Sequence, residues 1–322
     1  MEVLSNNEKA FVLEAANKGI RMDGRGLFDC RKLTINFTKT RGQVEVSLGD
    51  SLVLCAVDIF IDSPYTDRPN EGFLTFNVEF LPMAHPNFET LLGTNLVQRH
   101  KRFRNELSAE IERVLEKSIK KSRALNTESL CIVSGKHCWN VTVHMHILAH
   151  HGNLIDLCTQ ASVLALMHAR VHDVKINPDK TIELLPVLKP LSLHFLAISV
   201  TFGFLKGQIA ILDPEIKEEA VLEGKVVICM NVYGDILALQ KSGAAALKEE
   251  VIFQCLDLAL IKTKETTKEL RKAVENAGEI DLAMENPEIR VNKLLAEIAS
   301  LFTIYNKIFY KIKNFARLET LQ

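Results

Sequence analysis

Leu33-Thr34-Ile35-Asn36-Phe37 and Val44-Glu45-Val46-Ser47-Leu48 alternate apolar and polar side chains with a period of two. Successive side chains of a β-strand point to opposite faces, so both segments predict strands. Gly49-Asp50 provides a two-residue turn, and the apolar run Leu52 to Ile61 follows it as a third strand. The chain is therefore expected to build a hairpin or meander here.

Further elements flank this meander on both sides. Upstream, Asn6 to Asn17 has the apolar and polar spacing of a short amphipathic helix. Downstream, the proline-containing stretch Ser63 to Asn70 predicts a loop, and the mostly apolar Phe73 to Phe80 predicts another strand. From Gly93 to Ser122, apolar residues recur at helical spacing among charged ones, which predicts a helix with one packed face.

The next elements are a hairpin, a helix and a linker. Leu130 to Val133 and Trp139 to Leu148 predict two strands joined across Gly135-Lys136. Thr159 to Val171 predicts a helix. The stretch Asp173 to Pro190 is comparatively polar and contains three prolines, which favours a linker.

A second group of strands and a long helix follow the linker. The predicted helix is Ala244 to Glu275, and the predicted strands are Leu193 to Leu205, Gln208 to Asp213, Val226 to Asn231 and Ile236 to Gln240. Strands and helices are grouped instead of strictly alternating, which is typical of the α+β class with mixed sheets. We expect an N-terminal arm at 1–28, a first lobe at 29–172, the linker at 173–190, a second lobe at 191–275 and a C-terminal extension at 276–322.

Composition limits the possible partners and compartments. The 322 residues include 39 Lys and Arg against 40 Asp and Glu, so a net charge of −1 gives no global attraction to polyanions. Any contact with nucleic acid must be local or must be completed by a partner. The seven scattered cysteines favour buried reduced thiols and an intracellular location. The sequence shows neither a secretory signal nor an apolar stretch long enough to span a bilayer, so no membrane partner is expected.

Seven short motifs stand in order over most of the chain before the extension. They are Arg21-Met22-Asp23-Gly24-Arg25, Glu71-Gly72-Phe73, Pro82-Met83-Ala84, Asn126 to Val133, Gly152 to Asp156, Leu212-Asp213-Pro214 with Glu218-Glu219, and Ser242-Gly243. Together they resemble the RNase PH-like subunits of the eukaryotic RNA exosome. The resemblance implies an RNase PH-like fold (ribosomal protein S5 domain 2-like), with two lobes of mixed sheet packed with helices. Within the family, Thr127 to Cys131 and Trp139 look closest to one particular subunit.

The resemblance also identifies a degenerate catalytic site. Active members bind phosphate through a Thr-Arg pair after two glycines, and here Leu154 and Ile155 occupy those two positions. An arginine can hold a phosphate through two hydrogen bonds, whereas isoleucine offers no donor. Two acidic residues of active members fall at Glu219 and Lys225, and a one-turn slip would place Glu223 at the second position instead. We therefore expect no catalytic residues, no metal and no cofactor.

Two groups of side chains have alternative interpretations. Arg68, Arg99, Lys101, Arg102 and Arg104 could contact RNA phosphates, because these ring subunits line a pore for single-stranded RNA; the alternative is a solvated helix face. The histidines His144 and His146, with His150 and His151, could bind zinc, but no Cys-x-x-Cys partner accompanies them. An ordinary strand and turn is the favoured interpretation.

The C-terminal extension carries an apolar stripe. Its residues, spaced alternately by four and three, are Leu294, Ile298, Leu301, Tyr305, Ile308, Ile312 and Phe315. Such a heptad stripe favours a helix that docks on a partner. Disorder remains the alternative interpretation for this segment.

The resemblance implies a non-catalytic structural subunit of the RNA exosome core ring, which supports 3'-to-5' RNA processing and degradation, including rRNA maturation and RNA decay. Its implied partners are other RNase PH-like subunits in a hexameric ring, S1/KH cap subunits, an associated hydrolytic nuclease and single-stranded RNA in the channel. The implied locations are the nucleus, nucleolus and cytoplasm. Two alternatives stay open: an active phosphate-dependent 3'-to-5' exoribonuclease, and a free-standing RNA-binding module, which the near-neutral charge disfavours.

Overall fold

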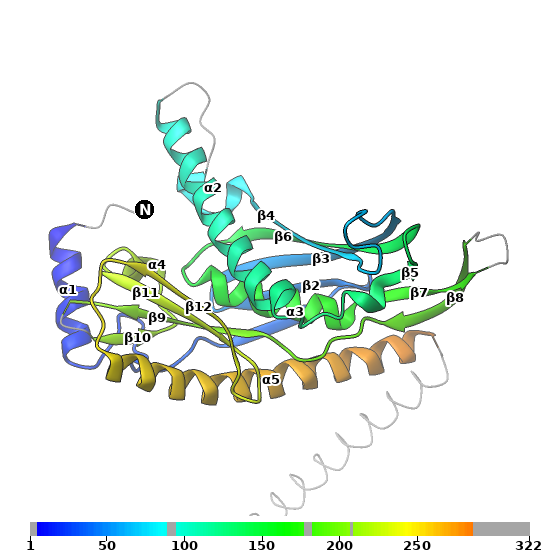
Figure 1. The fold of residues 1–322 in the computed structure, drawn as a ribbon. Helices are drawn as coiled ribbons and strands as arrows, with labels where there is room; N and C mark the ends of the chain where they lie inside the picture. Colours follow the sequence, from blue (N-terminus) through cyan, green and yellow to red (C-terminus); the bar gives the residue numbers. More distant parts are fainter. Residues whose placement is uncertain (1–4, 89–94, 177–181, 207–208, 286–322) are drawn as a thin grey trace, which may run out of the picture. The chain divides into compact units, whose positions relative to one another are not determined.

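A six-stranded mixed sheet forms the first lobe of the computed structural model, which describes residues 5–88, 95–176, 182–206 and 209–285 (Figure 1). Its strands are β1 (Leu33–Phe37), β2 (Gln43–Leu48), β3 (Ser51–Asp62), β4 (Phe73–Phe80), β5 (Cys131–Val133) and β6 (His137–Ala149). Their order is β1-β2-β3-β6-β4, and β5 pairs with β6. Strands β4 and β6 are parallel, whereas the other pairs are antiparallel. The predicted meander and the predicted hairpin are both confirmed.

The alternation in the sequence sets the face that each strand buries. In β2 every second residue is buried, and β3 alternates in the same way over most of its length. Val44, Val46, Val53, Val143 and Met145 are fully enclosed, so the three adjacent strands share one apolar face. Removing such side chains from water is the main favourable term for this layer.

A four-stranded antiparallel sheet forms the second lobe. Its strands are β9 (Ile198–Phe204), β10 (Ala210–Leu212), β11 (Gly224–Met230) and β12 (Ile236–Gly243), in the order β10-β9-β11-β12. The short helix α4 (Ile216–Glu219) connects β10 to β11. One face of this sheet packs on Cys255 and Ala259 of α5 (Glu249–Glu285), around Phe202 and Ile228. The α+β class is thus confirmed, with a mixed first sheet and an antiparallel second sheet.

Helix α3 (Leu154–His168) lies between the two sheets. It contacts β2 and β3 on one side and β9 on the other, and all its residues except Met167 are buried. Helix α2 (Asn95–Leu115) contacts β4 and α3, and a π-helical turn (Glu116–Lys121) continues it. The N-terminal helix α1 spans Asn6–Asn17, as predicted. Single 3-10 turns occur at Pro82–Ala84, Pro86–Phe88 and Glu128–Leu130.

The sequence-based prediction misplaced α3 and the segment after it. The helix was expected at 159–171, but it begins at Leu154, because Gly152 and Asn153 adopt left-handed conformations and end the preceding turn. It ends at His168, since Arg170 already belongs to β7. The expected linker 173–190 lies largely in an antiparallel hairpin of β7 (Arg170–Ile176) and β8 (Ile182–Pro190). The exposed edges of a two-stranded ribbon tolerate the prolines of β8.

The last helix also differs from its predicted bounds. It begins at Glu249 instead of Ala244, because Ala244 donates a backbone hydrogen bond to Glu223 and Ala245 packs into the second core. It continues through Glu285, beyond the predicted end at Glu275, since no helix-breaking proline occurs before Pro287. The chain divides into two compact units, Met1–Arg271 and Lys272–Gln322, and this helix contributes to both.

Some predictions fall outside the described residues. The heptad stripe from Leu294 to Phe315 is one of them, and the side chains of Arg99, Lys101, Arg102 and Arg104 are also outside the described part. Among the helices that are described, none combines the length and apolar character needed to cross a bilayer. Of the cysteines, Cys30 is exposed, Cys131 is partly buried and the other five are buried.

Candidate functional site

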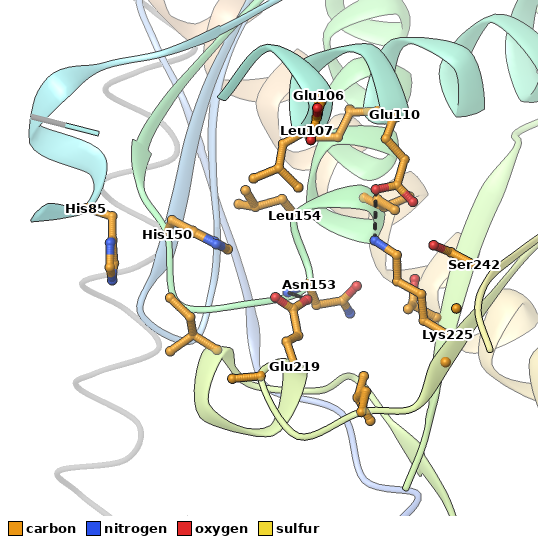
Figure 2. Close-up of a pocket in the computed structure, with 18 of the residues that line it drawn as sticks. His85, Glu106, Leu107, Glu110, His150, Asn153, Leu154, Glu219, Lys225 and Ser242 are labelled. Atoms are coloured by element: carbon orange, nitrogen blue, oxygen red, sulfur yellow. Dashed lines mark hydrogen bonds and ion pairs between the residues drawn. The ribbon is translucent and has the colours of Figure 1, made fainter. Parts of the chain in front are cut away.

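A pocket of about 380 Å³ opens in the first unit, where α2, the start of α3, α4 and β11 meet (Figure 2). Leu154, Ile155, Glu219 and Lys225 all line it. These residues lie up to 71 positions apart in the sequence. The structure therefore brings the four degenerate positions together at one site. Glu223 lines the same pocket, so both registers of the second acidic position lead to it.

The turn before α3 shapes one wall of the pocket. Gly152 has φ +95°, and a Cβ at this position would lie 2.6 Å from the carbonyl oxygen of Pro214. Only glycine allows the turn to approach the start of α4 this closely. Asn153 follows with φ +49°, a left-handed conformation that asparagine tolerates better than most residues. This turn sets the direction in which α3 starts.

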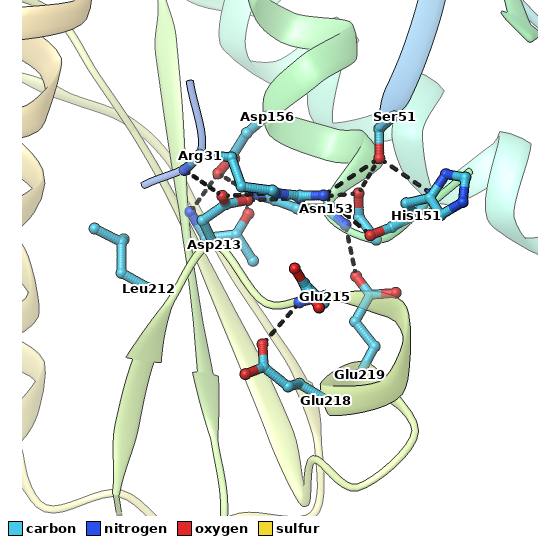
Figure 3. Close-up of polar contacts among 12 residues, drawn as sticks. Arg31, Ser51, His151, Asn153, Asp156, Leu212, Asp213, Glu215, Glu218 and Glu219 are labelled. Atoms are coloured by element: carbon cyan, nitrogen blue, oxygen red, sulfur yellow. Dashed lines mark hydrogen bonds and ion pairs between the residues drawn. The ribbon is translucent and has the colours of Figure 1, made fainter. Parts of the chain in front are cut away.

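Carboxylates of the chain itself occupy the N-terminal end of α3. The backbone N–H of Asn153 donates to Glu219 Oε1 at 3.0 Å (Figure 3). Asp156, in the first turn, accepts from the backbone N and Oγ1 of Thr201, both at 2.8 Å, and from Asn153 Nδ2 at 2.9 Å. A helix N-terminus attracts anions, and phosphate sites in many proteins use this property. Here Glu219 accepts the backbone N–H of Asn153, and Asp156 places a second acidic group in the first turn.

Burial changes the acidity of these two carboxyl groups. Desolvation raises the pKa of Glu219, against the lowering effect of the hydrogen bond from Asn153 and the charge of Lys225. Desolvation likewise raises the pKa of Asp156, although Asn153, Thr201 and Ser199 donate hydrogen bonds to it. Removal from water disfavours the charged form of an acid. Both carboxylates therefore carry an electrostatic cost that a second anion would increase.

Asp213 connects this turn to the N-terminal segment. Its carboxylate accepts from the backbone N of Arg31 at 2.9 Å, from the Arg31 guanidinium at 2.8 and 2.9 Å, and from Asn153 Nδ2 at 2.7 Å. Arg25 Nη1 adds a contact at 3.1 Å. Burial alone would raise the pKa of Asp213, but the hydrogen bonds and charge of Arg31 outweigh it and lower that pKa.

The Arg31 guanidinium also holds the turn before α3 in place. Besides Asp213, it donates to the carbonyl oxygens of His151 at 3.0 Å and Gly152 at 3.2 Å (Figure 3). These contacts fix the turn before α3 from the side opposite to Glu219. Arg31 does not line the pocket. It therefore stabilises the loop in which the resemblance implies a phosphate site, and its guanidinium lies outside the pocket.

The pocket itself has an acidic lining. Among the described residues that line it, four are glutamates, namely Glu106, Glu110, Glu219 and Glu223, and Lys225 alone carries a permanent positive charge. Lys225 Nζ lies 3.0 Å from Glu110 Oε2, and Gln240 Nε2 donates to Glu110 Oε1 at 3.4 Å. The ion pair connects β11 to α2. The single ammonium group is thus neutralised by a neighbour.

Two histidines, His85 and His150, line another wall of the pocket. His150 stacks on Phe88 with ring centroids 5.9 Å apart, and His85 lies 6.0 Å from His150. Burial, with a smaller effect of His85, lowers the pKa of His150 to about 3. His150 is therefore a neutral, apolar wall residue, and it accepts a hydrogen bond from the backbone N of Gly152 at 3.3 Å.

The remaining candidates lie apart from the pocket. Arg68 has a side chain 73% exposed and a long contact of 3.4 Å with Glu71. His144 Nε2 lies 3.6 Å from Asp58 Oδ2, and His146 Nδ1 lies 3.5 Å from Glu79 Oε2. Each histidine therefore has an acidic neighbour on an adjacent strand. Within the described part of the chain, no group of three or more His, Cys, Asp or Glu side chains is arranged for a metal ion.

Sequence reasoning missed the acidic residues of α2 and the support around Asp213. Glu106 and Glu110 follow an ordinary charged helix pattern, which carries no mark of a pocket. Asp213 belongs to the Leu212-Asp213-Pro214 motif, which signalled the family but not this hydrogen-bonding role. Arg31 stands in no recognisable motif. Its contacts span 182 positions and appear only in the folded chain.

Both lobes and the site now define the class of protein. The profile of the 3' exoribonuclease family, domain 1, matches residues 29–172, and that of domain 2 matches residues 196–262. These matches cover more than half of the chain, so the protein belongs to the 3' exoribonuclease (RNase PH) family. The family predicted from the seven motifs is confirmed.

Curated relatives narrow the similarity to one subunit. The chain is 40% identical to exosome complex component RRP45A of Arabidopsis thaliana over 283 residues, with 84% of this chain and 87% of the relative covered. It is 41% identical to RRP45B of the same plant, of which it spans 61%, and 36% identical to RRP45 of Danio rerio, with 90% and 74% covered. The subunit favoured by Thr127 to Cys131 and Trp139 is ribosomal-RNA-processing protein forty-five, or exosome component nine, in agreement with these names.

Solved structures share the fold. One is titled as the Archaeoglobus fulgidus exosome with RNA bound to the active site; it is 28% identical, has a TM-score of 0.66, and covers 82% of this chain and 98% of its own. An archaeal exosome core is 27% identical with a TM-score of 0.64, and covers 83% and 97%. The RNase PH-like fold expected from the sequence is confirmed.

Proposed function

We propose that the chain is a non-catalytic structural subunit of an RNA exosome core ring, supporting 3'-to-5' RNA processing and degradation. The similarity to RRP45 relatives and to archaeal exosome chains supports its assembly with other exosome subunits. One observation supports the lack of catalysis above all others. At the two positions where the resemblance implies a phosphate-binding hydroxyl and guanidinium, the aliphatic side chains of Leu154 and Ile155 line the pocket.

The electrostatics of the pocket oppose phosphorolysis. Inorganic phosphate and an RNA backbone are both anionic, and they would enter a pocket with four described glutamates and one paired lysine. The two positions that carry a hydroxyl and a guanidinium in active relatives are the buried aliphatic residues Leu154 and Ile155. Neither side chain can donate a hydrogen bond. Stabilising the charge of a phosphoryl-type transition state needs cations or donors at this place.

RNA degradation by the purified protein tests this proposal. The chain alone, and the chain assembled with its ring partners, would each be incubated with end-labelled single-stranded RNA, with and without inorganic phosphate. We expect no phosphate-dependent release of nucleoside diphosphates that can be assigned to this chain. Such release by the chain alone would support the active-exoribonuclease alternative and would overturn the proposal.

The proposed partners follow from the ring architecture. They are other RNase PH-like subunits, S1/KH cap subunits, an associated hydrolytic nuclease and single-stranded RNA in the channel. Co-purification of the tagged chain with mass identification of its partners tests this part. Recovery of the chain alone, or only as a homo-oligomer, would contradict it. Imaging of the tagged chain would test the proposed nuclear, nucleolar and cytoplasmic distribution.

The basic residues remain candidates for contact with the RNA. Arg68 is exposed and weakly paired, so its guanidinium can reach a phosphate. Arg99, Lys101, Arg102 and Arg104 follow one another on the first turns of α2. Replacing these five residues by glutamine in the assembled ring should shorten the RNA segment protected from nuclease. Unchanged protection in a correctly assembled ring would exclude this role.

A further inference from the structure

The acidic pocket raises the question of what it binds in place of phosphate. Glu106 and Glu110 belong to α2, and Glu219 comes from α4 on the other side (Figure 2). Leu107 and Leu154 are among the apolar residues that separate these carboxylates. A ligand that matches this lining has positive charge at its ends and an aliphatic body.

A buried acceptor in the pocket wall supports a ligand with hydrogen-bond donors. Asn153 lines the pocket and is only 2% exposed. Its Nδ2 donates to Asp156 and Asp213, which fixes the orientation of the amide. Its Oδ1 has no hydrogen-bond partner among the described residues. Figure 2 shows this side chain directed toward the space bounded by Glu219 and Lys225. A buried acceptor without a donor is unfavourable, and a donor on a bound molecule would correct this.

We propose that this pocket binds an aliphatic polyamine, with one ammonium group at Glu219 and Asn153 and another at the α2 carboxylates. The inference rests on the proposed function, because an active member would need the same pocket for phosphate. An ammonium group has three donors and no acceptor, which suits carboxylate and amide oxygens. The methylene chain between the charges packs on the leucines and isoleucines of the wall.

The side chains present favour an organic cation over a metal ion. Within the described residues, no group of three or more possible metal ligands is arranged for coordination. The apolar walls formed by Phe88, Leu107, Ile111, Leu154 and Ile155 would not solvate a hydrated metal ion. A polyamine uses both the charges and the apolar surface of the pocket. The Lys225 ammonium forms its ion pair with Glu110, and its charge acts on Glu219 only as a secondary effect.

Calorimetric titration of spermidine into the full chain at physiological salt tests the proposal. We expect one binding site, with affinity at least tenfold lower in Glu219→Gln, which corresponds to about 1.4 kcal/mol. Glutamine keeps an acceptor for the backbone N–H of Asn153 but removes the charge. Glu106→Gln, on an exposed position of α2, should also weaken binding. Glu128→Gln, an exposed change outside the pocket, is the matched control and should bind as the unmodified chain does.

Competition separates a specific site from diffuse charge attraction. Magnesium ions carry charge without an aliphatic body, so they should not displace spermidine at equal charge concentration. The absence of spermidine binding, equal binding by all variants, or displacement by magnesium would each overturn the inference. None of these results bears on the proposed function. That proposal fails if the chain releases nucleoside diphosphates with phosphate or is recovered without exosome partners, so the two failures are distinguishable.

Discussion

Replacing Arg21 by methionine should destabilise the protein strongly, because Arg21 forms a buried ion pair with Glu218. The side chains are 1% and 5% exposed. Arg21 Nε donates to Glu218 Oε1 at 2.9 Å, and the same guanidinium donates to the carbonyl oxygens of Leu212 at 2.7 Å and Asp213 at 2.8 Å. The substitution leaves one buried carboxylate and two buried carbonyls without these donors.

The magnitude follows from the cost of an uncompensated buried charge. Breaking one side of such a pair costs about 3 to 5 kcal/mol of unfolding free energy. Glu218→Gln should also destabilise, because the amide oxygen replaces only one of the two carboxylate acceptors and the NH₂ group then faces a guanidinium N–H. In the double variant no charge of the pair remains buried. Its loss should therefore fall below the sum of the single losses by about 1 to 3 kcal/mol.

Denaturant unfolding of the four proteins in this double-mutant cycle provides the measurement. Arg68→Met is the matched control, because Arg68 is 73% exposed and its pairing with Glu71 is long. It should change stability by less than about 0.5 kcal/mol. A loss below about 1 kcal/mol for Arg21→Met, or additive effects in the double variant, would refute the reasoning.

Three further predictions concern the turn before α3 and its surroundings. Gly152→Ala should lower the free energy of unfolding by more than about 3 kcal/mol, because its Cβ would lie 2.6 Å from the Pro214 carbonyl oxygen. Gly24→Ala is the control, since Gly24 has a similar φ of +82° but no atom within 4 Å of its Cβ position. It should lower the free energy of unfolding by only about 1 kcal/mol in the same thermal melts. The depressed pKa of His150, about 3 against an ordinary value of 6.5, means that the unfolded chain binds a proton before the folded chain does, so this group lowers stability as pH falls from about 7 toward 3. The loss should reach about 2 kcal/mol at pH 5 and disappear in His150→Gln; equal pH slopes in the two proteins would contradict it. Asn153→Asp should destabilise the protein by about 3 kcal/mol at neutral pH, since it replaces the amide that donates to Asp156 and Asp213 by a third carboxylate. An unchanged free energy of unfolding would show that these contacts contribute little.

The local sequence pattern was sufficient to predict the bounds of an element where one of its faces is exposed to water. The strands β1 and β4 and the helix α1 have the bounds that the sequence predicts. In each of these segments, alternating or helical spacing separates the exposed side from the packed side, so the period of the pattern is visible in the sequence. Helix α3 has no such asymmetry. It is buried on all sides between two sheets, so its sequence does not show where it begins.

The site likewise has a part that the linear sequence identifies and a part that only the folded chain shows. Leu154, Ile155 and Lys225 could be identified as departures from an active pattern, because motif order and spacing are properties of the linear sequence. The sequence did not indicate that Glu219 bonds to the start of α3 or that Glu110 pairs with Lys225 over 115 positions. The sequence also did not indicate that Asn153 Oδ1 lacks a hydrogen-bond partner among the described residues.

The sequence by itself determined the family and the two-lobed α+β class, and it placed Leu154 and Ile155 where the resemblance implies a phosphate-binding pair. Only the tertiary structure decided that these residues line a pocket together with four described glutamates. The physical reason is that charge and hydrogen bonding in a pocket depend on distances between residues from different elements. Those distances are set when α2, α3, α4 and β11 pack together, and no local pattern encodes them.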